Sequence, residues 1–138
     1  MKQRIEEAKK ILLDNRKNGY TLPTNNKLYP AQWNWDSAFI ALGYSYFNLD
    51  YALEEMETLL AGQWDDGMVP HILFHDNDTT YFPNHTTWKC GKNIPSSGIT
   101  QPPVIASILK IILGNQQINE GQNNRVVQIK KKIKKYHD

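Results

Sequence analysis

The sequence lacks the marks of several protein classes. Its 138 residues include a single cysteine, Cys90, so the chain has no internal disulfide. The first residues, Met1 to Glu7, have no apolar core of the kind that signal peptides need. No apolar run approaches the roughly 18 residues of a membrane span, and a net charge of +2 is too small to indicate a nucleic-acid-binding protein. We therefore expect a cytoplasmic protein with neither a membrane nor a nucleic acid as its partner.

The spacing of apolar residues, which make up 40% of the sequence, is mostly helical. It predicts helices over residues 2–17, 36–47, 51–61, 101–113 and 123–136. No two segments have a convincing strand pattern. The sequence therefore predicts an all-α chain of about five helices.

Several helix ends and faces follow from particular residues. Gly114-Asn115 is a typical helix stop. Asp50 is expected to cap the third helix, and Pro102-Pro103 to lie in the first turn of the fourth. The outward face of the third helix is expected to carry three acidic residues, Glu54, Glu55 and Glu57.

Helical periodicity disappears over residues 62–98, a segment far longer than ordinary connections of about 4–6 residues. The segment is no low-complexity linker, because it contains several large apolar side chains: Trp64, Met68, Ile72, Phe74, Tyr81, Phe82 and Trp88. Long ordered loops of this kind tend to line a functional site. Within it, Asp66-Gly67 signals a tight turn, so Asp65 and Asp66 are interpreted as turn residues rather than as a general acid and base.

The most informative stretch is residues 28–37, Leu-Tyr-Pro-Ala-Gln-Trp-Asn-Trp-Asp-Ser. It groups a tyrosine, two tryptophans, a carboxylate and two amides directly before an apolar run. A sugar ring is held in this way, because its C–H face stacks on an indole and its hydroxyls bond to carboxylate and amide groups. The alternative is a pair of core tryptophans beside a helix start, with Asp36 or Ser37 near the N-cap. The stretch alone leaves both interpretations open.

Two further polar clusters lie where predicted helices meet loops, at residues 62–72 and 96–103. In the first, His71 follows Pro70 and can bond to hydroxyls or carboxylates through either ring nitrogen. A structural histidine is the simpler interpretation of His71 taken alone.

The remaining polar clusters do not predict a metal site. His71, His75 and His85 lie in a loop and lack the fixed spacing of zinc ligands. Asp76-Asn77-Asp78 lacks the glycine and glutamate of a calcium loop. We expect no metal and no cofactor.

The basic ending of the chain, residues 125–135, invites a nucleic-acid interpretation. However, apolar side chains recur there at spacings of three and four: Val126, Ile129, Ile133 and Tyr136. The pattern favours a helix with one apolar face and a solvated basic face.

Three stretches, taken in order, resemble glycoside hydrolase family 63, and within it the mannosylglycerate and glucosylglycerate hydrolases. They are Tyr29 to Ser37, Gly67 to His71 and Gly98 to Pro103, and the resemblance covers residues 28–113. It implies that the chain is the N-terminal portion of an (α/α)6 barrel, one partial domain over residues 1–138, with a basic C-terminal helix at 115–138 outside the resemblance. It also implies cleavage of a glycosidic bond with inversion.

The resemblance also implies roles for individual residues. Tyr29, Trp33, Trp35 and Asp36 are expected to line the sugar subsite, and His71 and Gln101 to contact the sugar or its acidic aglycone. Inverting hydrolysis needs a carboxylic acid and a carboxylate base about 6.5–9.5 Å apart. In the family both come from later segments, so we expect them beyond residue 138. The chain is accordingly expected to be a fragment, a truncated product, or one part of an assembly.

Two classes of function remain in view. In the first, the chain contributes the sugar-binding shell of an inverting hydrolase of a small α-glucoside or α-mannoside such as glucosylglycerate or mannosylglycerate. A trehalase-like hydrolase and a sugar epimerase are alternatives within the same barrel. In the second, it is a stand-alone helical carbohydrate-binding or protein-interaction module without catalysis. The expected partners are a small-molecule sugar glycoside and, through an exposed half-barrel face, a second copy or a complementing chain.

Overall fold

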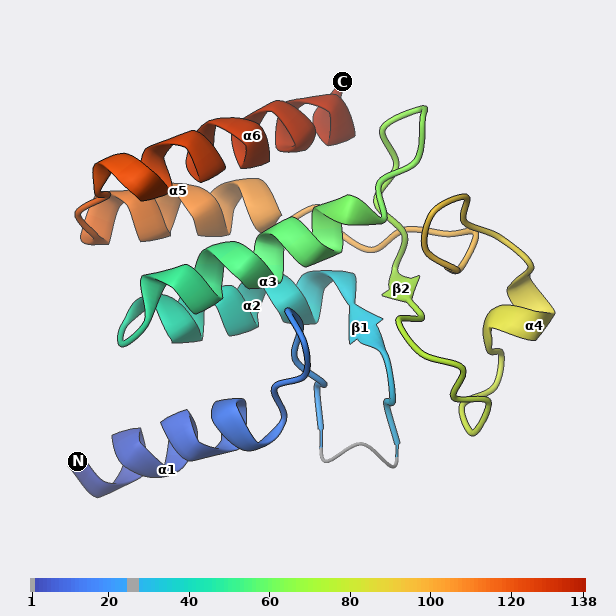
Figure 1. Cartoon of the computed structure of the whole chain (residues 1–138), viewed down its shortest axis with the longest axis horizontal. Coiled ribbons are helices and arrows are strands. Elements are labelled where there is room, and N and C mark those ends of the chain that lie inside the picture. The colour runs from blue at the N-terminus through green and yellow to red at the C-terminus, as the bar shows by residue number, and fades with distance from the viewer. Residues whose placement is uncertain (1, 25–27) are drawn as a thin grey trace.

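A computed structural model describes residues 2–24 and 28–138 of the chain. In chain order the elements are α1 (Lys2–Asp14), β1 (Gln32–Trp33), α2 (Asn34–Ser45), α3 (Leu49–Ala61), β2 (Ile72–Leu73), α4 (His85–Trp88), α5 (Ile105–Asn115) and α6 (Glu120–His137) (Figure 1). The five predicted helices are all present. The short helix α4 inside the long loop was not predicted.

The core lies between four of the long helices. Helix α2 packs against α3 and α5, while α6 covers both α3 and α5. In Figure 1, α5 and α6 lie on one side of the α2–α3 pair and α1 on the other. The apolar stripe predicted for the C-terminal segment is confirmed, because Val126, Ile129 and Ile133 of α6 are buried in this core. Burying each such side chain stabilises the fold by about 1.5–3 kcal/mol.

Helix α1 is attached to this core along one edge only. None of its residues is fully buried, and it approaches α2 where Leu12 meets Gly43. A Cβ atom at Gly43 would lie 3.0 Å from Leu12 Cδ1, so the glycine permits this close contact.

Helix α2 begins at Asn34, two residues before the predicted start. Trp33 occupies the N-cap position and makes no side-chain cap, so neither Asp36 nor Ser37 caps the helix. Helix α3 is capped by Asn48, whose side chain accepts from the N–H of Tyr51 at 3.1 Å. The predicted cap, Asp50, lies inside the first turn instead. Asparagine is as good an N-cap residue as aspartate, so the sequence pattern did not separate the two positions.

Two other predictions about helix ends and faces are wrong. Helix α5 begins at Ile105, so Pro102-Pro103 precede the helix rather than lie in its first turn. On α3, Glu54 and Glu57 form ion pairs with arginines near the surface, but Glu55 is fully buried. The reason is a set of polar partners at Glu55, described below, that periodicity alone does not reveal.

The loop between α3 and α5 is ordered, as predicted. Its turn at Asp66-Gly67 is confirmed by the hydrogen bond from the Gly67 N–H to the Trp64 carbonyl at 3.0 Å. The loop also contains β2, which pairs antiparallel with β1 so that Trp33 faces Ile72. Two-residue strands are too short for an alternating pattern, which explains why the sequence did not predict them. No helix within the described residues is both long and apolar enough to cross a membrane.

Candidate functional site

The three sequence clusters meet where α2 begins. The N–H of Asn34 donates to the carbonyl of His71 at 3.0 Å, and the N–H of His71 donates to the carbonyl of Ile99 at 2.8 Å. The side chain of Gln101 joins the same place, because its Oε1 accepts from the N–H of Trp35 at 3.1 Å. Segments separated by more than 60 positions in the chain are therefore joined by direct hydrogen bonds into one cluster.

Gln101 also completes the N-terminus of α2. The first N–H groups of a helix have no partner within the helix, and Trp33 at the N-cap position provides no side-chain acceptor. Gln101 Oε1 supplies one from the loop before α5. The start of α2 and the position of Gln101 are therefore fixed together.

The aromatic residues of this cluster divide into exposed and buried ones. Trp35 is 43% exposed and Tyr29 is 40% exposed, whereas Trp33 is only 7% exposed. The Trp33 ring packs edge-on against Tyr29 and Tyr81, both at 5.2 Å between ring centroids. The alternative of two core tryptophans is therefore confirmed for Trp33 and wrong for Trp35, and the sugar interpretation stays a prediction. Trp33 is a core tryptophan that supports Tyr29, and Trp35 presents an accessible indole.

Asp36 lies in the first turn of α2, beside Trp35. Burial raises the pKa of its carboxyl group, and hydrogen bonding by its own backbone and by the Trp35 side chain offsets part of that rise. The N-terminus of a helix favours a negative charge. A half-buried carboxylate at this place is suited to accept hydrogen bonds from hydroxyl groups.

His71 is held through one ring nitrogen. Its Nδ1 lies 2.6 Å from Ser97 Oγ, which also accepts from the N–H of Ile72 at 3.2 Å. Burial lowers the pKa of His71, so the ring is neutral at pH 7. With Nδ1 engaged by Ser97, the opposite nitrogen, Nε2, is the one that can bond to a ligand.

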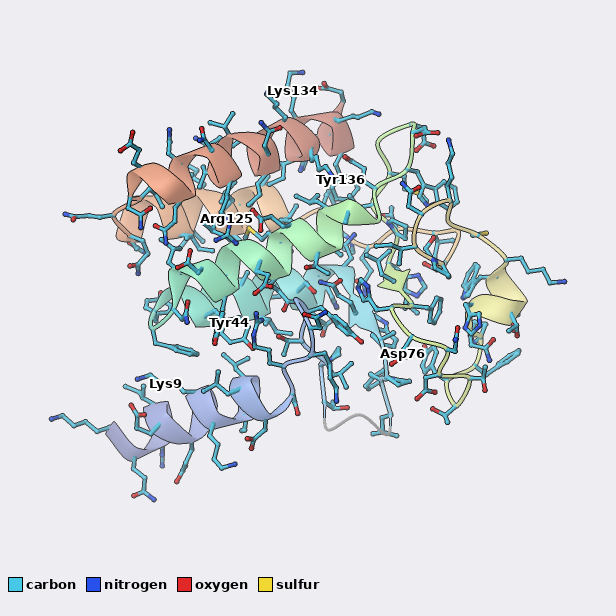
Figure 2. The ribbon with its side chains drawn as sticks, viewed as in Figure 1. Lys9, Tyr44, Asp76, Arg125, Lys134 and Tyr136 are labelled. Carbon is cyan, nitrogen blue, oxygen red and sulfur yellow. The ribbon has the colours of Figure 1, made fainter. Side chains whose placement is uncertain are left out.

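Sequence reasoning missed the contribution of Tyr136 on α6. Its hydroxyl lies 2.6 Å from Thr100 Oγ1, 3.1 Å from Asn34 Nδ2 and 3.1 Å from the Gln101 carbonyl. Figure 2 shows Tyr136 near the end of α6 that is next to the loops. The only sequence signal was its place at the end of the apolar stripe of α6, where a tyrosine brings a polar group to the edge of the core.

A second missed feature is a buried polar network behind the cluster. Gln32 Nε2 donates to Ser37 Oγ at 3.0 Å and to Glu55 Oε1 at 3.1 Å, and Ser37 Oγ donates to Glu55 Oε1 at 2.6 Å. On the other side, His75 Nε2 lies 2.7 Å from Gln32 Oε1. Because Gln32 Oε1 only accepts, Nε2 of His75 carries the proton.

Burial shifts the pKa values of both titratable groups in this network. It raises the pKa of Glu55 to about 7, and hydrogen bonds with Ser37, Thr21 and Gln32 offset part of the rise. It lowers the pKa of His75 to about 4, with partial compensation from the charge of Asp76. His75 is therefore neutral at pH 7, whereas Glu55 is divided between its two forms.

A cavity of about 450 Å³ lies beside this region and contains none of the six predicted site residues. Its lining comes from residues 61–66 and 91–94, including Trp64, Asp65, Asp66 and Lys92. Of the six predicted residues, Tyr29 and Trp35 are exposed and Trp33 is buried. Among the described residues, no group of three or more His, Cys, Asp or Glu side chains is arranged to hold a metal ion.

Comparison with known proteins identifies similar sequences and structures. Residues 29–138 match the family model of the mannosylglycerate hydrolase MGH1-like glycoside hydrolase domain. The chain is 47% identical over 112 residues to mannosylglycerate hydrolase MGH2 of Selaginella moellendorffii, covering 80% of this chain and 23% of that protein. It is 39% identical over 107 residues to a glucosylglycerate hydrolase of Mycolicibacterium hassiacum, covering 72% of this chain and 24% of that protein.

Solved structures of a GH63 mannosylglycerate hydrolase from Thermus thermophilus have the same fold. One, in complex with Tris and D-glycerate, has a TM-score of 0.86 at 37% identity and covers 96% of this chain and 31% of that chain. Another, in complex with glucose, has a TM-score of 0.79 at 35% identity and covers 96% of this chain and 32% of that chain. GH63 enzymes fold as (α/α)6 barrels, so the all-α prediction and its assignment to part of such a barrel are confirmed.

Two details of these matches bear on the prediction from the sequence. The family match continues to residue 138, and so includes the basic helix α6 that the motif-based resemblance left out. The chain spans only about a quarter to a third of the length of the relatives it matches. The family is therefore shown over residues 29–138.

Proposed function

Since the chain belongs to the mannosylglycerate hydrolase MGH1-like glycoside hydrolase family, we propose that it forms the sugar-binding shell of an inverting glycoside hydrolase. Its substrates would be small α-mannosides or α-glucosides such as mannosylglycerate and glucosylglycerate. The relatives that carry these activities, and solved structures of a relative with D-glycerate and with glucose, support this choice of ligand class.

The observation that carries the proposal is the bond between Gln101 and the Trp35 N–H, at 3.1 Å. It sets the Gln101 side chain at the main chain of Trp35, whose indole is exposed and which directly precedes Asp36. An indole face, a carboxylate and an amide are the groups that a sugar needs: the indole contacts its C–H face, and the polar groups bond to its hydroxyls. His71 is joined to the same cluster through the Asn34 N–H.

In this proposal each predicted residue has its own role. Trp35 and Tyr29 provide accessible aromatic surface, and Trp33 supports Tyr29 from the core. Asp36 accepts hydrogen bonds from sugar hydroxyls. Gln101 and neutral His71 contact the sugar or the carboxylate of its aglycone.

Catalysis needs a carboxylic acid to protonate the leaving oxygen and a carboxylate to activate water on the opposite face of the sugar. Among the six predicted residues only Asp36 is a carboxylate. As the family resemblance implies, we propose that both catalytic carboxyl groups lie outside residues 1–138 and that this chain binds sugar without hydrolysing it alone.

Two exposed apolar side chains, on helices that pack against each other, support a second element of the proposal. Phe39 of α2 is 53% exposed, and Ile111 of α5, a helix that packs against α2, is 44% exposed. Large exposed apolar side chains on adjacent helices mark an interaction surface. We propose that this face meets further barrel helices and that the chain alone self-associates through it. A strictly monomeric chain in analytical ultracentrifugation would contradict this element.

The test of sugar binding is isothermal titration of the 138-residue chain with mannosylglycerate and glucosylglycerate. Trp35→Ala combined with Asp36→Ala should abolish saturable binding. Tyr46→Ala is the matched control, because Tyr46 is an exposed aromatic residue of the segment just after α2 and is 66% exposed. It should bind as the wild type does.

Three outcomes would overturn the proposal or part of it. A folded wild-type chain that binds neither compound would remove the sugar-binding role. If NMR showed that the chain alone releases glycerate, this would contradict the placement of the catalytic groups elsewhere. Binding that survives in the double variant would show that the site lies in another part of the chain.

A further inference from the structure

We propose that Glu55 is a positioning residue for the sugar-binding cluster: its carboxyl group holds Gln32 and Ser37, which flank Trp33 to Asp36, and ionisation tightens this hold. The ligand in this inference rests on the proposed function, whereas the positioning of the cluster does not. Glu55 itself is fully buried, with 0% of its surface exposed.

One oxygen of Glu55 accepts hydrogen bonds from the two residues that flank Trp33 to Asp36. Oε1 accepts from Gln32 Nε2 at 3.1 Å, at the start of β1, and from Ser37 Oγ at 2.6 Å, in the first turn of α2. Gln32 Nε2 also donates to the main-chain carbonyl of Glu55 at 3.2 Å. All three residues are buried, with at most 1% of their surface exposed. Helix α3 thus holds the segment that turns Trp33 inward and Trp35 outward.

The second carboxyl oxygen has no such partners. Glu55 Oε2 is buried and makes no hydrogen bond with any described residue. Two opposing effects act on the pKa of this buried carboxyl group. Burial favours the protonated form, and hydrogen bonds with Ser37, Thr21 and Gln32 favour the ionised one. The balance leaves the pKa of Glu55 near 7.

Ionisation should therefore change the strength of the hold. Hydrogen bonds from Ser37 and Gln32 to a carboxylate are shorter and stronger than those to a neutral carboxyl group. Above the pKa of Glu55, the segment from Gln32 to Ser37 should be held more rigidly. Trp35 and Asp36 then lose less freedom when a sugar binds, so affinity should rise with pH.

The neighbouring groups with shifted pKa values, His75, Tyr20 and Tyr44, keep their state near pH 7. His75, which bonds to Gln32, has its pKa lowered to about 4 and is neutral. Burial raises the pKa of Tyr20 and of Tyr44 above 10.0, so both remain neutral. The nearby charges are those of Asp76, which acts on Tyr20 and His75, and Arg16, which pairs with Glu54 and acts on Tyr44. A transition near pH 7 in this network therefore belongs to Glu55.

The first measurement uses the full chain without ligand. The indole N–H signals of Trp33 and Trp35, assigned with Trp→Phe variants, are followed by NMR between about pH 5.5 and 8.5. In the wild type both should shift with a midpoint near 7. Glu55→Gln should remove this midpoint, because the amide keeps the size of the side chain and does not titrate. Glu57→Gln, two residues along the same helix, should retain it.

A second variant keeps the test valid if Glu55→Gln does not fold. Ser37→Ala removes one of the donors that favour the ionised form, so the midpoint should move to higher pH. A purely structural role for Glu55 predicts loss of stability in these variants without any midpoint to remove or move. A wild type without a midpoint, or a Glu55→Gln variant that keeps it, would overturn the inference.

The second measurement is the affinity for mannosylglycerate across the same pH range. The wild type should bind about tenfold more tightly above the midpoint than below it, and Glu55→Gln should show a flat profile. If no sugar binds at any pH but the Glu55-dependent midpoint is present, the proposed function fails and the positioning role stands. If sugar binds with the same affinity throughout and no midpoint exists, the positioning role fails and the proposed function stands.

Discussion

The hydroxyl of Tyr136, near the end of α6, lies 2.6 Å from Oγ1 of Thr100 in the loop before α5. Thr100 Oγ1 in turn lies 2.6 Å from the carbonyl of Val69, to which it donates. The Tyr136 hydroxyl also donates to the carbonyl of Gln101 at 3.1 Å, and its oxygen accepts from Asn34 Nδ2 at 3.1 Å. Through this one hydroxyl, α6 is bonded to the residues that form the candidate sugar site.

Tyr136→Phe should lower the free energy of unfolding by about 1–2 kcal/mol, because it removes the hydroxyl that accepts from Nδ2 of the buried Asn34 and donates to the Gln101 carbonyl. Tyr46→Phe is the control, since Tyr46 is 66% exposed and loses only a hydroxyl at the surface. Urea unfolding followed by tryptophan fluorescence measures both. Equal stability of the two variants would show that the Tyr136 hydroxyl contributes nothing beyond its ring.

A pair of glycine substitutions tests how the loop turn meets α6. Gly67 has a φ of +100°, and a Cβ there would lie 2.2 Å from the main-chain oxygen of Lys135. Gly67→Ala should therefore destabilise the fold by about 2 kcal/mol or more. Gly114, in α5, has no atom within 4 Å of such a Cβ, so Gly114→Ala should stabilise by about 0.5–1 kcal/mol. Thermal unfolding measures the change in stability of each variant, and the two changes should have opposite signs. A Gly67→Ala variant as stable as the wild type would contradict the close packing of the turn against α6.

The stability of the fold should depend on pH through two buried groups whose pKa values are shifted in opposite directions. The pKa of Glu55 is raised from 4.5 to about 7, so its contribution to stability is full below pH 4.5 and is lost as the pH rises through 7. The pKa of His75 is lowered from 6.5 to about 4, so its contribution is full above pH 6.5 and is lost as the pH falls towards 4. Between about pH 4.5 and 6.5 the two slopes oppose each other.

In Glu55→Gln, His75 is the one of these two groups that still makes the stability depend on pH. Relative to this variant, the wild type should lose about 3 kcal/mol of stability between pH 4.5 and a pH well above 7, because each pKa unit corresponds to about 1.4 kcal/mol. Urea unfolding at several pH values measures the difference, with Glu57→Gln as the control that should run parallel to the wild type. Parallel curves for Glu55→Gln and the wild type would contradict the raised pKa.

The sequence was sufficient for the long helices but not for what joins them. Residues of α6 such as Ile129 repeat with a helical period, so their burial could be predicted. The two-residue strands and the main-chain bonds from Asn34 to His71 and from His71 to Ile99 have no side-chain pattern to detect. They follow from where the helices place the loops, which a single sequence does not contain.

Individual site residues were predictable by type but not by exposure. Trp33 and Trp35 are two positions apart and equally aromatic, yet the first is buried and the second is open because the chain changes from strand to helix between them. Glu55 was expected at the surface because a charge usually lies there. Its partners Gln32 and Ser37 lie 23 and 18 positions away in the sequence, and helical periodicity does not reveal contacts between residues so far apart.

Gln101 offers a way to separate helix capping from sugar binding. Gln101→Ala removes the acceptor of the Trp35 N–H, so it should lower both the stability, by about 1 kcal/mol, and the affinity for mannosylglycerate. Gln101→Glu keeps an acceptor at the N-terminus of α2, where a negative charge is favourable, so stability should equal or exceed that of the wild type. The same carboxylate would repel the carboxylate of the glycerate group, and affinity should fall by at least about tenfold. Stability from urea unfolding and affinity from titration should therefore change together in the first variant and separately in the second. A Gln101→Glu variant as unstable as Gln101→Ala would show that the side-chain oxygen does not cap α2.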